Sequence, residues 1–302
     1  MAILVQALVL IAIIGVGVGI KRIRWVRAQD FPIFSNIVLK ITLPCALATS
    51  FDEARIDTSL LAIVAVGVVV NLAQQVAGHL IGRRHGRSEQ AFAVLNIGTY
   101  NMGAFAIPYL GGFLGPQAIV IASLFDVGNA IVGAGIGYAW AMSLAHNEAR
   151  VSARTFLRQM FSSVIFVTYL PLLALKLLDL RLPGPILQFT ATVGAANTFL
   201  AMLMIGIGLE VHLHRVKVRS ALRYLGVRYA FAIGFALTVW FLLPFEPAIR
   251  VVIVTVLFAP IASMTPGFTS EAGGDVERSA FMVSASILVG LVAMPALLLL
   301  LR

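Results

Sequence analysis

The chain has 302 residues, of which 60% are hydrophobic and only 12% are charged, and its formal net charge is +9 at pH 7. Soluble domains carry roughly 25% charged residues, so this composition excludes an ordinary soluble globule. The basic residues stand in short clusters between apolar runs, which is typical of a membrane protein and not of a nucleic-acid-binding domain. The single cysteine, Cys45, allows neither an internal disulfide nor a cysteine-based metal site.

The chain opens on an apolar run at about residues 2–20, and a basic cluster follows it at 21–27. A secretory signal peptide has its basic residues before the apolar run, so this order favours a first membrane helix with an outward N-terminus. About 20 apolar residues cross a bilayer, and helices are required because lipid offers no hydrogen-bond partner to the backbone. The sequence predicts ten such spans, at about 2–20, 32–50, 59–81, 90–114, 117–143, 159–178, 185–209, 224–243, 248–270 and 279–301.

The distribution of Lys and Arg tests this count, because the spans are drawn from hydrophobicity alone. With the N-terminus outside, the inner loops hold most of the 22 basic residues, namely Lys21, Arg22, Arg24, Arg27, Arg83, Arg84, Arg87, Arg150, Arg154, Arg158, Arg215, Lys217, Arg219, Arg223, Arg228 and Arg278. Every inner loop but the last then satisfies the positive-inside rule. We therefore expect both termini outside the cytoplasm.

The longest polar connection lies in the middle of the chain, at 145–158, and separates a first half, 1–144, from a second half, 159–302. Each half holds five expected spans, and an odd number inverts the second half relative to the first. Inverted repeats recur in secondary transporters. The predicted fold class is an all-α polytopic membrane protein, with ten transmembrane helices in two inverted five-helix repeats. No GxxxxGK[ST] loop is present, which argues against an ATP-driven pump.

Prolines interrupt the fourth span of each half. In the span at 90–114, Pro108 stands among several glycines, and we expect the helix to break near it. The span at 248–270 carries Pro260 and Pro266 at the equivalent place. Breaks at the midplane are tolerated only where protein or a water-filled cavity satisfies the freed backbone groups. Helix breaks are accordingly expected at Pro108, Pro260 and Pro266, and also at Pro44 in the second span.

The run Asn101-Met-Gly103-Ala-Phe-Ala106-Ile-Pro108 resembles the N-x-G-x-x-G-x-P segment of the auxin efflux carrier family, which includes plant PIN-type carriers and bacterial organic-acid permeases. Other segments are similar to helices two, five, seven and nine of that family: LKITLPCAL around Pro44, LFDVGNAIVG around Asp126, LMIGIGLEV, and LFAPIASMTP around Pro260. The resemblance implies a ten-helix homodimer in which helices four and nine cross at their prolines. It implies substrate binding beside that crossing, at Asn101, Gly103, Pro108 and Pro260.

The chain departs from the family pattern at three places. Thr198-Phe199 stands where the family often has Ala-Pro, which leaves the bend of the seventh helix open. Ala106 replaces a glycine two residues before the first proline. Lys40 occupies a place that is usually neutral, so the substrate is expected to differ accordingly.

Lys40 and Asp126 are ionisable residues that we expect near the midplane, where such residues indicate function by default. Three interpretations stay open. The two residues form a structural ion pair; Lys40 extends to the cytoplasmic interface; or Lys40 binds an anionic substrate, while Asp126 and Asn129 handle a coupling Na+ or H+. His212 and His214 lie in a basic loop, and we interpret them as solvated residues rather than metal ligands.

The leading functional hypothesis is an alternating-access secondary transporter for a small organic anion, such as a carboxylate or an auxin-like acid, in a bacterial inner membrane. We expect no cofactor beyond Na+ or H+, no metal and no nucleic-acid partner. The first alternative is a sodium-coupled symporter of the bile-acid type. A non-transporting membrane receptor and an intramembrane enzyme are both much less favoured, and no nucleophile and base are paired within the spans.

Overall fold

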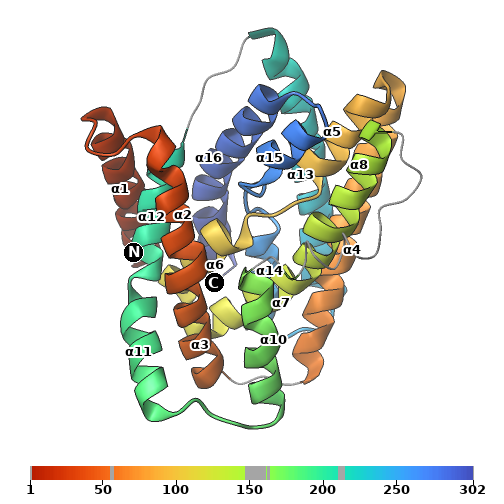
Figure 1. Ribbon diagram of the computed structural model, residues 1–302. Coiled ribbons are helices and arrows are strands. Elements are labelled where there is room, and N and C mark those ends of the chain that lie inside the picture. The colour runs from red at the N-terminus through yellow and green to blue at the C-terminus, as the bar shows by residue number, and fades with distance from the viewer. Residues whose placement is uncertain (1, 55–57, 147–160, 162–163, 210–214, 302) are drawn as a thin grey trace.

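The computed structural model describes residues 2–54, 58–146, 161, 164–209 and 215–301, and the secondary structure of these residues is entirely helical (Figure 1). The connection expected at 145–158 lies almost wholly outside the described residues, as do His212 and His214. The division of the chain into 1–144 and 159–302 therefore stays a prediction.

The helices of the first half are α1 (Ala2–Arg22), α2 (Phe31–Ile37), the π-helical turn η2 (Val38–Thr42), α3 (Leu43–Glu53), α4 (Ala62–Gly82), α5 (Arg87–Ile97), the π-helical turn η5 (Met102–Ala106), α6 (Ile107–Leu114), α7 (Pro116–Asn129), the π-helical stretch η6 (Ala130–Gly137) and α8 (Tyr138–His146). The second half contains α10 (Val164–Leu177), α11 (Gly184–Ala195), α12 (Asn197–Gly208), α13 (Arg215–Phe241), α14 (Pro247–Val256), α15 (Thr265–Glu271) and α16 (Val276–Leu300).

Among the described residues, 7 helices are long and apolar enough to cross a membrane by length and composition: Ile3–Arg22, Phe31–Glu53, Ala62–His85, Pro116–His146, Gly184–Gly208, Val218–Leu242 and Val276–Leu300. The spans expected at 90–114, 159–178 and 248–270 coincide with shorter helices. The described part of the chain is thus all-helical, with multiple helices that are suited to span a membrane. Ten crossings in two inverted repeats stay a prediction.

One side of the molecule consists of α1, α2–α3, α10 and α11–α12. Helix α1 packs along α12, and α3 packs against α10 and α11 (Figure 1). At the α1–α12 contact the backbones of Gly17 and Gly206 approach so closely that a Cβ on either residue would overlap the other helix. Small residues permit such close packing in membrane helices. We refer to these helices as the scaffold.

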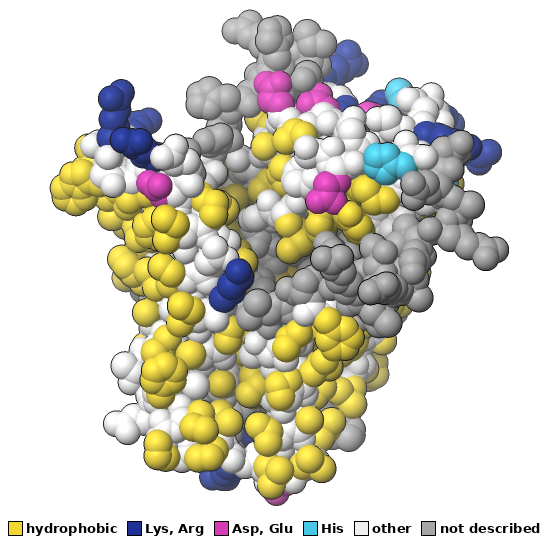
Figure 2. Space-filling view, viewed as in Figure 1, with side chains coloured by type: hydrophobic (Ala, Val, Ile, Leu, Met, Phe, Trp, Pro, Cys, Tyr) yellow, Lys and Arg dark blue, Asp and Glu magenta, His cyan; other side chains and the backbone are white. Residues whose placement is uncertain are grey.

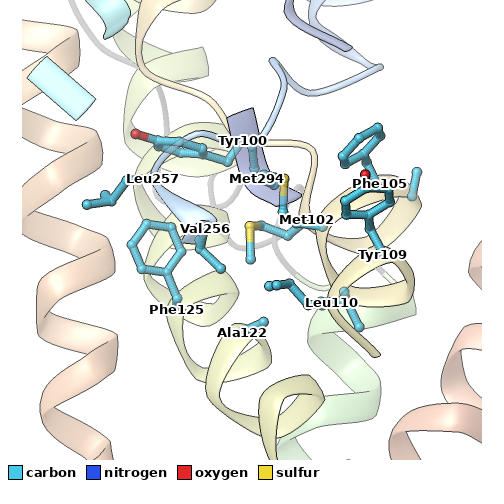
Figure 3. Packing of buried hydrophobic residues seen from close by; sticks show 14 of the residues in the cluster. Tyr100, Met102, Phe105, Tyr109, Leu110, Ala122, Phe125, Val256, Leu257 and Met294 are labelled. Carbon is cyan, nitrogen blue, oxygen red and sulfur yellow. The ribbon is translucent and has the colours of Figure 1, made fainter. Parts of the chain in front are cut away.

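The remaining helices form a second body around an aromatic and aliphatic core. Helix α4 packs against α5 and α7, and α13, α14 and α16 pack on one another. Figure 3 shows Tyr100, Phe125 and Met102 in this core, near Leu257 and Met294. The rings of Tyr100 and Phe125 meet edge to face, with centroids 5.6 Å apart. We refer to this body as the core bundle.

Basic residues gather at one end of the molecule. Figure 2 shows Lys and Arg side chains mainly along the upper edge, above a flank covered by hydrophobic side chains. At this end Arg278 donates two hydrogen bonds to Glu89, at 2.9 and 2.7 Å, and the Tyr224 hydroxyl donates a third at 2.7 Å. Burial raises the pKa of Glu89, but these hydrogen bonds and the charge of Arg278 together hold that pKa below its ordinary value. The cluster joins α5 to α13 and α16.

The predictions of helix breaks at Pro44 and at Pro108 are wrong. Pro44 and Pro108 do not break their helices, because a π-helical turn precedes each of them: η2 ends two residues before Pro44, and η5 ends two residues before Pro108. Proline lacks an N–H group, and its ring clashes with the carbonyl one turn back. The wider π turn relieves both problems within a continuous helix.

Candidate functional site

The first helix break lies upstream of Pro108. Helix α5 ends at Ile97, and residues 98–101 are buried and not helical. Side chains from three other helices satisfy the freed backbone groups. Asn129 accepts from the N–H of Tyr100 at 3.1 Å and donates to its carbonyl at 3.2 Å, and Gln75 donates to the Gly98 carbonyl at 3.3 Å. The Arg228 guanidinium donates to the Ile97 carbonyl at 2.6 Å.

The second break lies where proline is expected to cause one. Helix α14 ends at Val256, residues 257–264 are not helical, and Pro260 lies inside this segment. Pro266 occupies the first turn of α15, where its missing N–H group needs no partner. The N–H of Ile261 donates to the Ser286 hydroxyl at 2.9 Å.

The two breaks touch, and we call the contact region formed by 98–101 and 257–264 the crossing. The N–H of Asn101 donates to the Pro260 carbonyl at 2.8 Å, and the Asn101 side-chain amide donates to the Ser263 hydroxyl at 2.7 Å. At the edge of the crossing, the hydroxyls of Thr99 and of Thr265, the first residue of α15, are 3.1 Å apart. The polar groups that both breaks release are thus paired with each other as well as with neighbouring helices.

A cavity of about 460 Å³ lies beside the crossing, between the scaffold and the core bundle. Five residues singled out from the sequence line it: Lys40, Asn101, Gly103, Asp126 and Asn129. The other lining residues include Phe31 and Ser35 at the start of α2, so the cavity extends from the crossing toward the basic end.

The structure does not bring the prolines themselves into the cavity lining. Pro260 contributes to the crossing through its carbonyl. Pro108 lies in α6, where its carbonyl accepts a hydrogen bond of 3.1 Å from Thr198 on α12. That bond joins the core bundle to the scaffold. Pro44 and Pro266 are also outside the lining.

Asp126 and Lys40 both line the cavity but are not paired in the part of the chain that the structure describes. The Asp126 carboxylate accepts a hydrogen bond from Asn129 at 2.8 Å and another from the Tyr169 hydroxyl at 3.1 Å. Asp126 is only 6% exposed, whereas Lys40 is exposed on η2. Because Tyr169 belongs to α10, its bond to Asp126 links the scaffold to the core bundle.

Arg228 is the main functional candidate that the sequence analysis misses. Its assignment to an inner loop is wrong: Arg228 is fully buried in α13, ten residues into the helix Val218–Leu242, and donates to both breaks. The signal is present in the sequence, because an arginine within an apolar span is a functional hypothesis by default. Gln75 and Tyr169 give no such signal, since their roles arise only from tertiary contacts.

The seventh helix, whose bend the sequence leaves open, has a local interruption in the structure. The sequence has no proline there, yet α11 ends at Ala195 and α12 begins at Asn197. The Asn197 side chain accepts a hydrogen bond of 2.9 Å from Thr42 on η2. A buried polar pair thus lies at this interruption where the family resemblance implies a proline.

Comparison with known protein families gives two matches, one in each half of the chain. The family model described as Membrane transport protein matches residues 2–156, which include the first break and all five predicted residues of the cavity lining. The model described as Sodium Bile acid symporter family matches residues 197–302, which include Arg228 and the second break. No curated protein matches the chain. Because the first match covers half of the chain, this multi-pass membrane protein belongs to the auxin efflux carrier family of membrane transport proteins.

Proposed function

We propose that the protein is a secondary transporter that moves a small organic anion, such as a carboxylate or an auxin-like acid, by alternating access. The observation that carries this proposal is the cavity at the crossing of the two broken helices. Substrate sites of secondary transporters lie at such places, because broken helices expose backbone groups that can bind ions and polar substrates. The cavity, of about 460 Å³, is within the size range of small-molecule sites.

An anionic substrate is favoured by the groups that face the cavity. Met102, Gly103 and Ala104 open the helical segment η5–α6, and all three line the cavity. The N–H groups of a first helical turn have no partner within the helix, and the helix dipole favours negative charge there. The ammonium of Lys40 adds a positive charge from the scaffold side of the cavity, and the Asn101 amide offers a further polar contact. A carboxylate fits this combination.

We propose that the scaffold and the core bundle are the two bodies that move relative to each other. The cavity extends toward the basic end, which is cytoplasmic under the positive-inside rule, so this conformation is open to the cytoplasm. The same proposal includes ten crossings in two inverted repeats, both termini outside and a bacterial inner membrane. Dimerisation through the scaffold follows from the family resemblance, and native mass spectrometry should detect a species of twice 32.3 kDa.

Asp126 and Asn129 are proposed to handle the coupling ion, either H+ or Na+. The Asp126 carboxylate lies at the boundary between the two bodies, through its hydrogen bond to Tyr169 on the scaffold. A change in its charge alters a contact that must break when the bodies move. Replacing Asp126 by Asn should therefore uncouple uptake from the driving ion gradient.

Uptake by proteoliposomes tests the proposed function. Vesicles containing the protein should show saturable uptake of a labelled dicarboxylate or indole-type acid, selected by a thermal-shift screen of carboxylic acids. Asn101→Ala should abolish uptake and leave the amount of folded protein unchanged, because it removes a polar group from the cavity. The exposed Thr192 on α11 bonds only within its own helix, so Thr192→Ala is the matched control and should transport normally. Normal uptake by Asn101→Ala would remove Asn101 from the site.

A second candidate is a sodium-coupled symporter, which the match of residues 197–302 to the sodium bile acid symporter family favours. Uptake that requires an inward sodium gradient would support it, and equal uptake in sodium and in choline would contradict it. A receptor differs from both transporters because it binds ligand without flux into sealed vesicles. We assign no catalytic residues, since the family is one of transporters.

A further inference from the structure

Arg228 on α13 is a charged residue that the proposed transport site does not use. Its side chain is fully buried, and it does not line the cavity. No carboxylate pairs with it among the residues that the structure describes. A buried charge is costly unless other groups compensate it, so its surroundings must supply negative potential.

The guanidinium donates to carbonyl groups from both breaks. Nη1 donates to the Ile97 carbonyl at 2.6 Å, and Nη2 donates to the Ala259 carbonyl at 3.0 Å and to the Pro260 carbonyl at 3.4 Å. The Cζ atom also lies 4.3 Å from the centroid of the Tyr100 ring. One side chain thus holds together the last residue of α5 and the segment that follows α14.

The charge of Arg228 is offset by the end of α5 and by carbonyl groups of the unwound segment that follows α14. The C-terminus of a helix carries roughly half a negative charge on its unpaired carbonyls. Helix α5 ends at the guanidinium, and α14 ends at Val256, three residues before Ala259, so the negative end of α5 and the unwound carbonyls beyond α14 together offset part of the positive charge. In broken-helix transporters, such unwound carbonyls and half-helix C-termini coordinate the coupling cation. Arg228 satisfies the same groups here.

We propose that the Arg228 guanidinium occupies the place of a monovalent cation at the crossing, so that the protein supplies this cation itself and works without sodium. Removing the guanidinium leaves a cage of carbonyl oxygens from Ile97, Ala259 and Pro260. Two further oxygens of fully or almost fully buried residues nearby, Gln74 Oε1 and the Tyr100 hydroxyl, have no hydrogen-bond partner. Oxygen atoms of these kinds are ligands for a hard cation such as Na+. Loss of Arg228 should therefore convert the crossing into a sodium site.

Thermal unfolding in different salts tests the proposal without measuring transport. The wild-type protein should unfold at the same temperature in sodium chloride and in choline chloride of equal ionic strength. Arg228→Ala should unfold at a much lower temperature in choline and should regain most of that loss in sodium, with a saturable concentration dependence. Arg228→Lys keeps the charge and should unfold independently of the cation.

Arg250 is the matched control, because it donates to the Trp240 carbonyl away from the crossing; Arg250→Ala should show no response to sodium. Three results would overturn the proposal: wild type that sodium specifically stabilises, a sodium-dependent Arg228→Lys variant, or a folded Arg228→Ala variant that responds to no cation. If Arg228→Ala folds in neither salt, the unfolding temperatures of the wild type and of Arg228→Lys in the two salts decide whether the proposal holds.

Uptake provides a second readout, which rests on the proposed transport function. Wild-type vesicles should take up the substrate equally in sodium and choline, and a requirement for sodium would contradict the proposal. Wild-type vesicles that show no uptake in any salt count against the transport function, whereas the unfolding measurements still decide the role of Arg228. The failure of one proposal is thus distinguishable from the failure of the other.

Discussion

The two helix breaks that meet at the crossing are built differently. The first, at 98–101, contains no proline, is buried at every residue, and is held by Gln75, Asn129 and Arg228 from outside the broken helix. The second, at 257–264, contains Pro260 and exposes Ser263 and Met264. Pro260 removes one backbone donor from the second break, because proline has no N–H group.

This difference separates two ways of keeping a helix broken inside a membrane. In the second half the local sequence prevents regular hydrogen bonding. In the first half every residue of 98–101 could in principle continue the helix, so the break depends on side chains that reach it from other helices. Substitutions at those bracing side chains should therefore harm the protein more than substitutions of the prolines.

The largest effect is expected from Asn129→Ala. This change leaves the N–H and the carbonyl of Tyr100 buried without partners, which costs about 2–6 kcal/mol in the free energy of unfolding, at about 1–3 kcal/mol for each group. Asn71 is the matched control: it is equally an asparagine in the buried interior, but its amide bonds only the Gly67 carbonyl of its own helix. Thermal or denaturant unfolding in detergent measures both variants. Equal losses for Asn129→Ala and Asn71→Ala would contradict the bracing role.

Gly98→Ala should have the next largest effect on the free energy of unfolding. A Cβ at residue 98 would overlap the Gln75 side chain and lie 3.0 Å from the Asn71 carbonyl oxygen, so α4 would have to shift, at a cost of about 1–3 kcal/mol. Gly267 on α15 lies beyond the second break and has open space at the Cβ position. Gly267→Ala should be neutral or stabilise by up to about 1 kcal/mol. Unfolding measurements that rank the two variants in the opposite order would contradict the difference between the two breaks.

Replacing the prolines should lower the stability less, and the two prolines should differ in their effects. Pro260→Ala creates a buried N–H group and also frees the unfolded chain, for a combined cost of about 1–3 kcal/mol. Pro108→Ala should cost less than about 1 kcal/mol, because the π turn already accommodates Pro108 in a continuous helix. The test is to measure the free energies of unfolding of the two variants under the same conditions. A larger loss for Pro108→Ala would restore Pro108 as the cause of the first break.

The smallest effect concerns pH at the basic end, where Glu89 and Arg278 join the two halves away from the crossing. Because the pKa of folded Glu89 lies below its ordinary value, its contribution to stability is fully present above that ordinary value. The contribution is lost as pH falls through the lowered folded value. The stability difference between wild type and Glu89→Gln should therefore shrink between about pH 5 and pH 3. Melting curves across this range would refute the assignment if the difference stayed constant.

Hydrophobicity and charge predict where the helices lie, because the bilayer requires long apolar helices and the positive-inside rule orients them. Pro260 likewise predicts the second break, since the cause is local. The first break is placed wrongly at Pro108, because the groups that hold it, Gln75 and Asn129, are separated from it in sequence and no local pattern reveals their contacts.

The cavity lining is partly predictable for the same reason. Lys40, Asp126 and Asn101 are polar or charged residues in apolar or proline-interrupted spans, which is an unusual pattern that marks function. Tyr169 is an ordinary residue for a membrane helix, and its bond to Asp126 depends on how α10 packs against α7. The importance of Arg228 is predictable from the sequence, because an arginine within an apolar span indicates function; it is missed only because Arg228 is assigned to a loop.

A disulfide between the two broken segments tests the crossing most directly. Thr99 and Thr265 place their hydroxyls 3.1 Å apart, and Cys45 is the chain's single cysteine. In a Cys45→Ser background, Thr99→Cys with Thr265→Cys should form a disulfide under mild oxidation, detected by mass spectrometry of proteolytic fragments. Thr99→Cys with Thr192→Cys should not form one. Failure of the first pair to cross-link in the folded protein would contradict a pocket built where the two breaks meet.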